Sequence, residues 1–268
     1  MLSDITLGQY FPIESSLHKL DPRTKILALI LMIVAIFISQ TALTYALSAL
    51  FTLMIVFLSK VPPKMYIKSL KPIWFVIIFT AILNMFLTQG QMVYLFQIKT
   101  YIKYEGIILA IKMAIRLILL IITSAALTYT TSPIALTDGL ERLLKPVSKI
   151  GFPTHELAMM MSIAIRFIPT LIEETEKIIK AQKARGSDIG SGSFVKKIKA
   201  LTPMLVPLFI SAFRRADDLA VAMEARCYHG GKNRTRLKEI HYTTQDLKAA
   251  MVLVVFMAVL VALKIFGV

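Results

Sequence analysis

Two arginines stand out because each occupies the same short context at the predicted C-terminal end of an amphipathic helix. The two contexts, 41 residues apart, are Ala184-Arg185-Gly186 and Ala225-Arg226-Cys227. A cation is favoured at such an end because the unpaired carbonyls of the last turn carry partial negative charge. A guanidinium can also make bidentate contacts with carboxylates or backbone carbonyls of another protein. The small neighbours would let that protein's backbone approach closely.

A single arginine at a helix end needs no function, but two in matching contexts indicate docking. We interpret Arg185 and Arg226 as the contact points for one partner with two similar sockets, or for two related partners.

Residue patterns that perform catalysis are missing from the sequence. The segment Gly190-Ser191-Gly192-Ser193 lacks the lysine and the spacing of a phosphate-binding loop. The four histidines are scattered, without a His-Glu-x-x-His metal motif, and no Gly-x-Ser-x-Gly motif occurs. We interpret Cys227 as a small packing residue in an apolar seam and not as a nucleophile. We therefore expect no catalytic residue, no metal site and no cofactor bound by this chain.

The composition is that of an integral membrane protein. Hydrophobic residues make up 56% of the 268 residues, and the mean hydropathy is +0.69. Several apolar runs approach the ~20 residues that a helix needs to cross a ~30 Å hydrocarbon core. They are Ile26–Ile38, Ala42–Leu58, Ile73–Leu87, Gly106–Thr128 and Ala249–Val268. The sequence predicts an all-α integral membrane protein with about five transmembrane helices and a cytoplasmic domain of long crossing amphipathic helices.

The net charge of +15 follows the membrane topology and does not indicate a nucleic-acid-binding face. Of the 31 Lys and Arg residues, 18 lie between Thr131 and His241, where they are mixed with 11 Asp and Glu. Basic residues are retained on the cytoplasmic side of a membrane. We therefore expect the N-terminus and this region to be cytoplasmic and the C-terminus to lie outside, with the bilayer as a partner and no nucleic acid.

Four regions follow from these patterns. We predict a cytoplasmic N-terminal segment (1–25), a four-helix transmembrane part (26–130), cytoplasmic coupling helices (131–241) and a C-terminal transmembrane helix (242–268). Within the third region, the apolar stretch Leu157–Ile168 is too short to cross a bilayer unaided, so we place it at the interface or under the bundle of spans.

The two helices that carry the arginines are expected to cross one another. Downstream of Pro169, apolar residues recur on one helical face, and Glu173 and Glu174 lie on the solvated side. In the second helix, Pro203 and Pro207 are expected to limit regular structure. After them a seam of large and small residues repeats with 4-3-4-3 spacing and suits close helix crossing. This seam consists of Phe209, Phe213, Ala216, Ala220 and Met223. Surface ion pairs are expected from Arg214 and Arg215 to Asp217 and Asp218.

A further motif, Leu20-Asp21-Pro22-Arg23, precedes the first apolar run. Asp21 as N-cap and Pro22 at the first helical position make a strong helix start. Its simplest interpretation is a capped helix entrance that Arg23 anchors at the membrane surface.

Together these features resemble a known family, the EcfT-type transmembrane components of energy-coupling factor (ECF) transporters, which are related to the CbiQ-type proteins. The resemblance rests on Leu20-Asp21-Pro22-Arg23-Thr24-Lys25, on the two Ala-Arg contexts and on the order of spans and helical insert, so it covers nearly the whole chain. The second context departs slightly, because Cys227 replaces the glycine of the first.

The resemblance implies a non-catalytic coupling subunit of an ATP-driven importer for vitamins or other micronutrients in a bacterial cell membrane. Two cytosolic ABC ATPases (an EcfA-type pair), which bind ATP and Mg²⁺, would dock on the helix ends that carry Arg185 and Arg226. A separate membrane-embedded S component would capture the substrate.

Two other classes remain open from the sequence. The first is the permease subunit of a conventional ABC importer, which would itself line the substrate path and present a single coupling loop. The second is a membrane-embedded enzyme that uses Lys112 and Arg116, four residues apart on one helical face, to hold an anionic lipid. A charge pair alone supplies no nucleophile or base.

Overall fold

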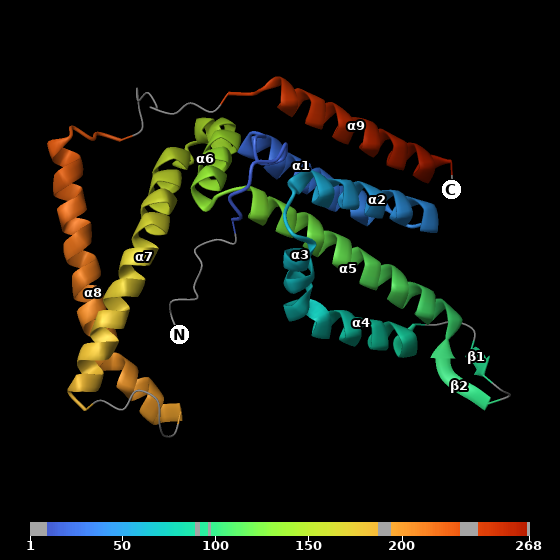
Figure 1. Cartoon of the computed structure of the whole chain (residues 1–268), viewed down its shortest axis with the longest axis horizontal. Coiled ribbons are helices and arrows are strands. Elements are labelled where there is room, and N and C mark those ends of the chain that lie inside the picture. Colours follow the sequence, from blue (N-terminus) through green and yellow to red (C-terminus); the bar gives the residue numbers. More distant parts are fainter. Residues whose placement is uncertain (1–9, 89–91, 96–97, 187–193, 231–240, 267–268) are drawn as a thin grey trace. The chain divides into compact units, whose positions relative to one another are not determined.

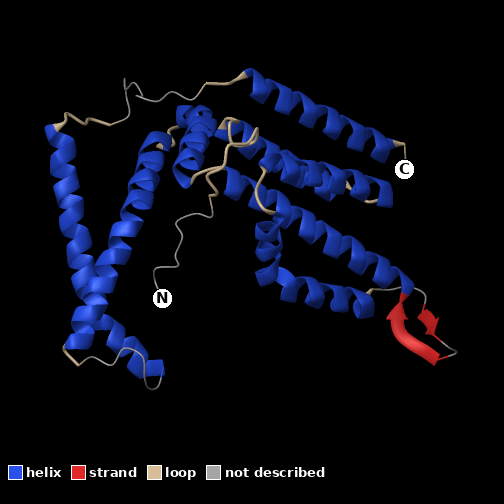
Figure 2. Ribbon diagram, viewed as in Figure 1, coloured by secondary structure: helices blue, strands red, loops and turns tan. Residues whose placement is uncertain are grey.

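The computed structural model describes residues 10–88, 92–95, 98–186, 194–230 and 241–266, and nearly all of them are helical (Figures 1 and 2). They form two compact units. Of these residues, the larger unit comprises those from 10 to 140 and from 241 to 266, and the smaller unit comprises those from 141 to 230. The helices are α1 (Pro22–Ile38), α2 (Ala42–Ser59), α3 (Pro63–Leu70), α4 (Trp74–Leu87), α5 (Tyr104–Thr130), α6 (Pro133–Leu144), α7 (Thr154–Ala184), α8 (Phe194–Ala225) and α9 (Thr244–Ile265), with short 3₁₀ turns η1 (Lys71–Ile73) and η2 (Lys145–Ile150).

Helix α5 is the centre of the larger unit, where it packs against α1, α2, α3 and α4, while α9 packs on α1 (Figure 1). The contacts use small polar residues as well as apolar ones. The buried hydroxyls of Ser39 and Ser48 lie 3.0 Å apart at the α1–α2 hairpin. At the α4–α5 contact, a Cβ on Gly106 would lie 2.7 Å from the carbonyl oxygen of Asn84. Small residues and interhelical hydrogen bonds are typical of helix packing in membranes.

Five helical segments of the described chain are long and apolar enough to cross a membrane: Ala42–Ser59, Pro63–Leu87, Tyr104–Thr130, Thr154–Ala184 and Thr244–Ile265. The chain is therefore an all-α membrane-embedded protein, as the sequence predicted. Four of these segments overlap predicted spans. The first predicted span lies in α1, whose 17 residues rise only about 26 Å.

Helix α7 also meets these criteria of length and composition, although the sequence placed its apolar stretch at the interface. The difference arises because the prediction counted only the residues up to Ile168. The helix continues without interruption through Pro169 and has 31 residues in all.

Between α4 and α5 the chain forms a short antiparallel hairpin from β1 (Met92–Leu95) and β2 (Ile98–Lys103), with Leu95 paired to Ile98 and Tyr94 to Lys99. Its β-branched and aromatic residues favour extended backbone. The hairpin adds to the helical architecture without altering it.

In the smaller unit, α7 and α8 cross (Figure 1). Helix α8 begins at Phe194 and runs through Pro203 and Pro207, so the expectation that these prolines limit regular helix was wrong. Pro207 has no N–H, which leaves the carbonyl of Pro203 without its usual donor four residues on. The side-chain amide of Gln182 in α7 donates to that carbonyl at 3.4 Å. A contact from the neighbouring helix thus compensates part of the backbone defect.

Candidate functional site

At the first arginine-bearing tip, α7 ends in a tight turn whose backbone groups hydrogen-bond to one another. The N–H of Arg185 donates to the carbonyls of Ala181 and Gln182, both at 3.2 Å, and the N–H of Gly186 donates to the carbonyl of Lys183 at 3.0 Å. Gly186 has a φ of +82°, which glycine adopts at little cost. Because the backbone satisfies its own last carbonyls, the exposed guanidinium of Arg185 is not needed to cap the helix.

The second tip repeats this termination with a different residue. Cys227 has a φ of +58°, and its N–H donates to the carbonyl of Glu224 at 2.9 Å. The N–H of Tyr228 reaches back to Met223 at 3.0 Å, which completes a Schellman motif. Arg226 is exposed, as Arg185 is.

The interpretation of Cys227 as a packing residue was wrong, because its thiol is exposed and its backbone reverses the chain. Cys227 and Gly186 therefore play the same backbone role after their arginines. From the crossing of α7 and α8, the C-terminal ends of the two helices point away in different directions (Figure 1).

An interhelical ion pair joins α7 to α8. The Arg215 guanidinium Nη2 lies 2.7 Å from Glu174 Oε2. Glu174 is therefore not merely a solvated residue. Arg215 pairs across the helices, and the ion pairs expected from Arg214 and Arg215 to Asp217 and Asp218 do not form among the described residues. The predicted stripe of α7 is half-buried at this contact, as its periodicity indicated: Leu171, Ile172, Thr175, Ile178, Ile179 and Gln182.

The predicted crossing seam of α8 does not face α7. Phe209 is 60% exposed and Phe213 68% exposed, and Ala216 and Ala220 are also exposed, while Met223 is half-buried. The face toward α7 carries Met204, Leu208, Ser211 and Arg215 instead. Spacing alone could not separate these two faces, because both repeat at intervals of three and four residues and only one can meet the stripe of α7.

The N-terminal motif forms a buried polar cluster in the larger unit. Asp21 Oδ1 accepts from the backbone N–H of Arg23 at 2.8 Å and so caps α1, as predicted. The Arg23 guanidinium binds both oxygens of the same carboxylate, the shortest contact being 2.7 Å. The guanidinium also stacks 3.9 Å from the ring centroid of Tyr242. Pro22 packs so closely on α6 that a Cβ on Gly139 would lie 2.8 Å from it.

This cluster joins the start of α1 to the start of α9. The backbone N–H of Asp21 donates to Asp246 Oδ1 at 2.7 Å across 225 residues. The other oxygen of Asp246 accepts from the N–H and the hydroxyl of Thr243, at 2.8 and 2.6 Å. The motif is therefore a tertiary junction as well as a helix entrance.

Comparisons with known proteins agree over almost the whole length. The family model for CbiQ, described as "Cobalt transport protein", matches residues 14–237. The chain is 54% identical over 257 residues to the energy-coupling factor transporter transmembrane protein EcfT of Ruminiclostridium cellulolyticum, covering 96% of each chain. It is 53% identical to that of Clostridium kluyveri over 99% of each chain. It is 46% identical to that of Bacillus subtilis over 98% of this chain and all of the relative.

The chain belongs to the CbiQ family. The resemblance to the EcfT-type proteins is thereby confirmed. Since the relatives are named as transmembrane components of a transporter, a membrane-embedded enzyme finds no support among them.

The geometry of Arg116 also removes the basis of that alternative. In this CbiQ-family chain, Arg116 Nη2 donates to the hydroxyl of Tyr45 at 2.8 Å and to the carbonyl of Ser39 at 3.4 Å. Ser39 follows the last residue of α1, so Arg116 caps that helix end from α5. The residue serves packing within the fold. Among the described residues, no cluster of three or more His, Cys, Asp or Glu side chains could hold a metal ion.

Sequence reasoning missed two parts of the polar cluster, Asp246 and Lys25. Thr243-x-x-Asp246 is a capping box that is visible in the sequence, although its second contact to Asp21 is not. Lys25 is buried, and its ammonium donates to the carbonyl of Thr130 at 2.9 Å and of His18 at 3.3 Å. No local pattern marks a lysine for burial. The segment 190–193 lies outside the described residues.

Proposed function

We propose that this CbiQ-family chain is the transmembrane coupling subunit of an ATP-driven importer for a vitamin or another micronutrient. It links two cytosolic ABC ATPases, which bind ATP and Mg²⁺, to a membrane-embedded S component that captures the substrate. The observation that carries the proposal is the pair of matching tips. Arg185 and Arg226 are exposed, and neither is needed to satisfy the helix end beneath it.

The chemistry of these tips fits docking. Each guanidinium presents a rigid fork of donors to carboxylates or carbonyls of a partner. The left-handed backbone of Gly186 or Cys227 ends the helix directly after the arginine. If ATP-driven closure moved two sockets together, α7 and α8 would act as levers joined at their crossing by Arg215 and Glu174.

The proposed orientation places the N-terminal segment and the smaller unit in the cytoplasm and the C-terminus outside. It takes α1, α2, the α3–α4 segment, α5 and α9 as the crossings. Support comes from the concentration of Lys and Arg between Thr131 and His241.

The experiment replaces both arginines, Arg185→Ala and Arg226→Ala, in a complex made by co-expression with the two ATPases and an S component. We expect recovery of the ATPases with the membrane subunit to fall about tenfold or more, because arginine anchors dominate such interfaces. ATP-driven uptake into proteoliposomes should be lost. Co-purification and uptake of the labelled substrate are the measurements.

Arg214→Ala is the matched control, since it removes an exposed arginine from the body of α8 and not from its tip. It should leave docking and uptake unchanged. Wild-type uptake in the double variant would contradict the proposal. Uptake by this chain and the ATPases without an S component would instead establish a conventional permease.

A further inference from the structure

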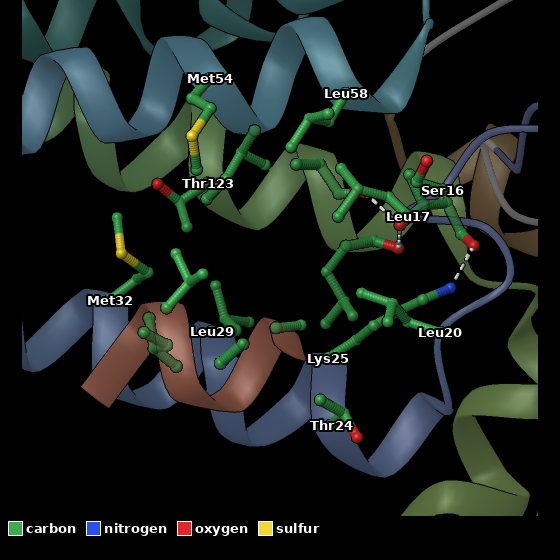
Figure 3. Close-up of a pocket in the computed structure, with 18 of the residues that line it drawn as sticks. Ser16, Leu17, Leu20, Thr24, Lys25, Leu29, Met32, Met54, Leu58 and Thr123 are labelled. Carbon is green, nitrogen blue, oxygen red and sulfur yellow. Dashed lines mark hydrogen bonds between the residues drawn. The ribbon is translucent and has the colours of Figure 1, made fainter. Parts of the chain in front are cut away.

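The larger unit contains a cavity of about 480 Å³ that opens to the surface and lies between four helices and the segment before α1 (Figure 3). Its walls come from α1, α2, α5 and α9, and most of the lining is aliphatic. On α1 the lining extends from Thr24 to Met32, about 12 Å of helix. Figure 3 shows Met32 and Met54 at one end and Leu20 and Lys25 at the other. The cavity therefore has the size of a small-molecule site and an elongated apolar body.

The end of the cavity near Lys25 is polar and cationic. The lining there includes Ser16, Thr24, Lys25, Gln245 and Lys248. Lys25 is only 8% exposed, and its two hydrogen-bond partners, Thr130 and His18, are neutral carbonyls. An ammonium has three donors, so these carbonyls use two of them. The carboxylates of Asp246 and Asp21 attract this ammonium, but neither forms an ion pair with it. An anion bound directly to the ammonium would further offset the cost of burying its charge.

Lys248 adds a second positive charge on the same side. Both Lys248 and its neighbour in the lining, Gln245, are exposed, so this side of the cavity lies at the protein surface. Both residues lie in the first two turns of α9, which are polar and precede its apolar stretch. The cationic end thus lies where a span begins, which is the level of lipid headgroups.

We propose that this cavity binds one anionic lipid. Its acyl chain occupies the aliphatic part between Leu29 and Met32, and its phosphate or carboxylate is held by Lys25 and Lys248. An apolar cavity of this size offers water too few polar partners, whereas a hydrocarbon chain fills it favourably. A charge-assisted hydrogen bond to the anion satisfies the remaining donor of Lys25. The bound lipid is then part of the folded larger unit, and its binding does not depend on the docking of ATPases.

Native mass spectrometry of the full chain released from lipid nanodiscs tests this binding. The probes are phosphatidylglycerol, zwitterionic phosphatidylcholine and palmitate, each added to delipidated protein. We expect one phosphatidylglycerol or one palmitate to be retained in preference to phosphatidylcholine. Phosphatidylglycerol as the tighter probe identifies a membrane phospholipid as the occupant, and palmitate as the tighter probe identifies a free fatty acid.

Charge and shape variants locate the site. Lys25→Gln should weaken retention about tenfold or more, because it removes a buried charge-assisted contact. Lys248→Gln should weaken it about fivefold, as expected for one basic residue near an anionic headgroup. Ala249→Phe places a ring in the lining and should abolish retention.

Two matched controls lie on the same helix. Lys264→Gln removes a charge at the far end of α9, and Ala250→Phe adds a ring outside the lining. Both should retain the lipid as the wild type does. Equal retention of phosphatidylcholine, or wild-type retention by both Lys248→Gln and Ala249→Phe, would overturn the proposal. Those two variants keep the test decisive even where Lys25→Gln fails to fold.

Discussion

Two arginine–carboxylate pairs, one in each unit, have the same 2.7 Å contact but different surroundings. In the larger unit, the side chains of Arg23 and Asp21 are 13% and 0% exposed. In the smaller unit, those of Arg215 and Glu174 are 35% and 28% exposed. Asp21 also caps α1, and its own N–H is bound by Asp246. Burial and additional partners, and not the N–O distance, therefore decide how much each pair stabilises the fold.

The same difference separates the roles of the two units. The larger unit buries Asp21, Lys25 and Asp246, whose hydrogen bonds join α1, α5 and α9. The smaller unit leaves Arg185, Arg226 and the aromatic rings of Phe209 and Phe213 exposed. Charged groups that are buried inside a fold are not available to a docking protein. The exposed groups are the ones that sequence patterns assigned to docking and helix crossing.

The largest effect is expected from removing the buried carboxylate of Asp246. Asp246→Ala leaves the N–H groups of Asp21 and Thr243 without their acceptor inside the protein. We expect a loss of about 3 kcal/mol in the free energy of unfolding. Thermal and denaturant unfolding in detergent measure the change. Asp217→Ala, on an exposed position of α8, is the control and should not shift the transition. An unchanged transition for Asp246→Ala would refute the assignment of this cluster as a junction.

A smaller effect on stability is expected at the C-terminal ends of α7 and α8, where the substitutions change a residue with positive φ and no ion pair. Cys227→Gly should stabilise the end of α8 by about 1 kcal/mol, because it relieves a side chain at φ +58°. Gly186→Ala should destabilise the end of α7 by a similar amount. The cost is conformational, since a Cβ there meets no atom within 4 Å.

Hydrogen exchange of the last turn of each helix measures these opposite changes. If both substitutions shift the protection from exchange in the same direction, α7 and α8 do not end in the same backbone motif.

The smallest effect is expected from the exposed pair. Glu174→Gln keeps the shape of the side chain and a hydrogen-bond acceptor for Arg215, and solvent screens the lost charge. The unfolding midpoint should match that of the wild type within measurement error. A destabilisation as large as that of Asp246→Ala would show that burial does not rank the effects of losing these two carboxylates.

Much of the architecture can be predicted from local patterns in the sequence. Long apolar runs have no favourable place outside a bilayer, so composition alone predicts the membrane-embedded helices. Asp21 and Pro22 mark the start of α1 because capping depends on neighbouring residues only. The two Ala-Arg contexts are local in the same sense, and the structure places both arginines at exposed helix ends.

Only the tertiary structure decided which groups meet across long separations. Asp21 and Asp246 are 225 residues apart, and the acceptor of Lys25 belongs to α5. The covered face of α8, the left-handed backbone of Cys227 and the four-helix cavity likewise depend on how whole helices pack. Local sequence determines the preferences of a helix and its faces. Packing selects among faces of similar periodicity, because only one of them can be buried against a given neighbour.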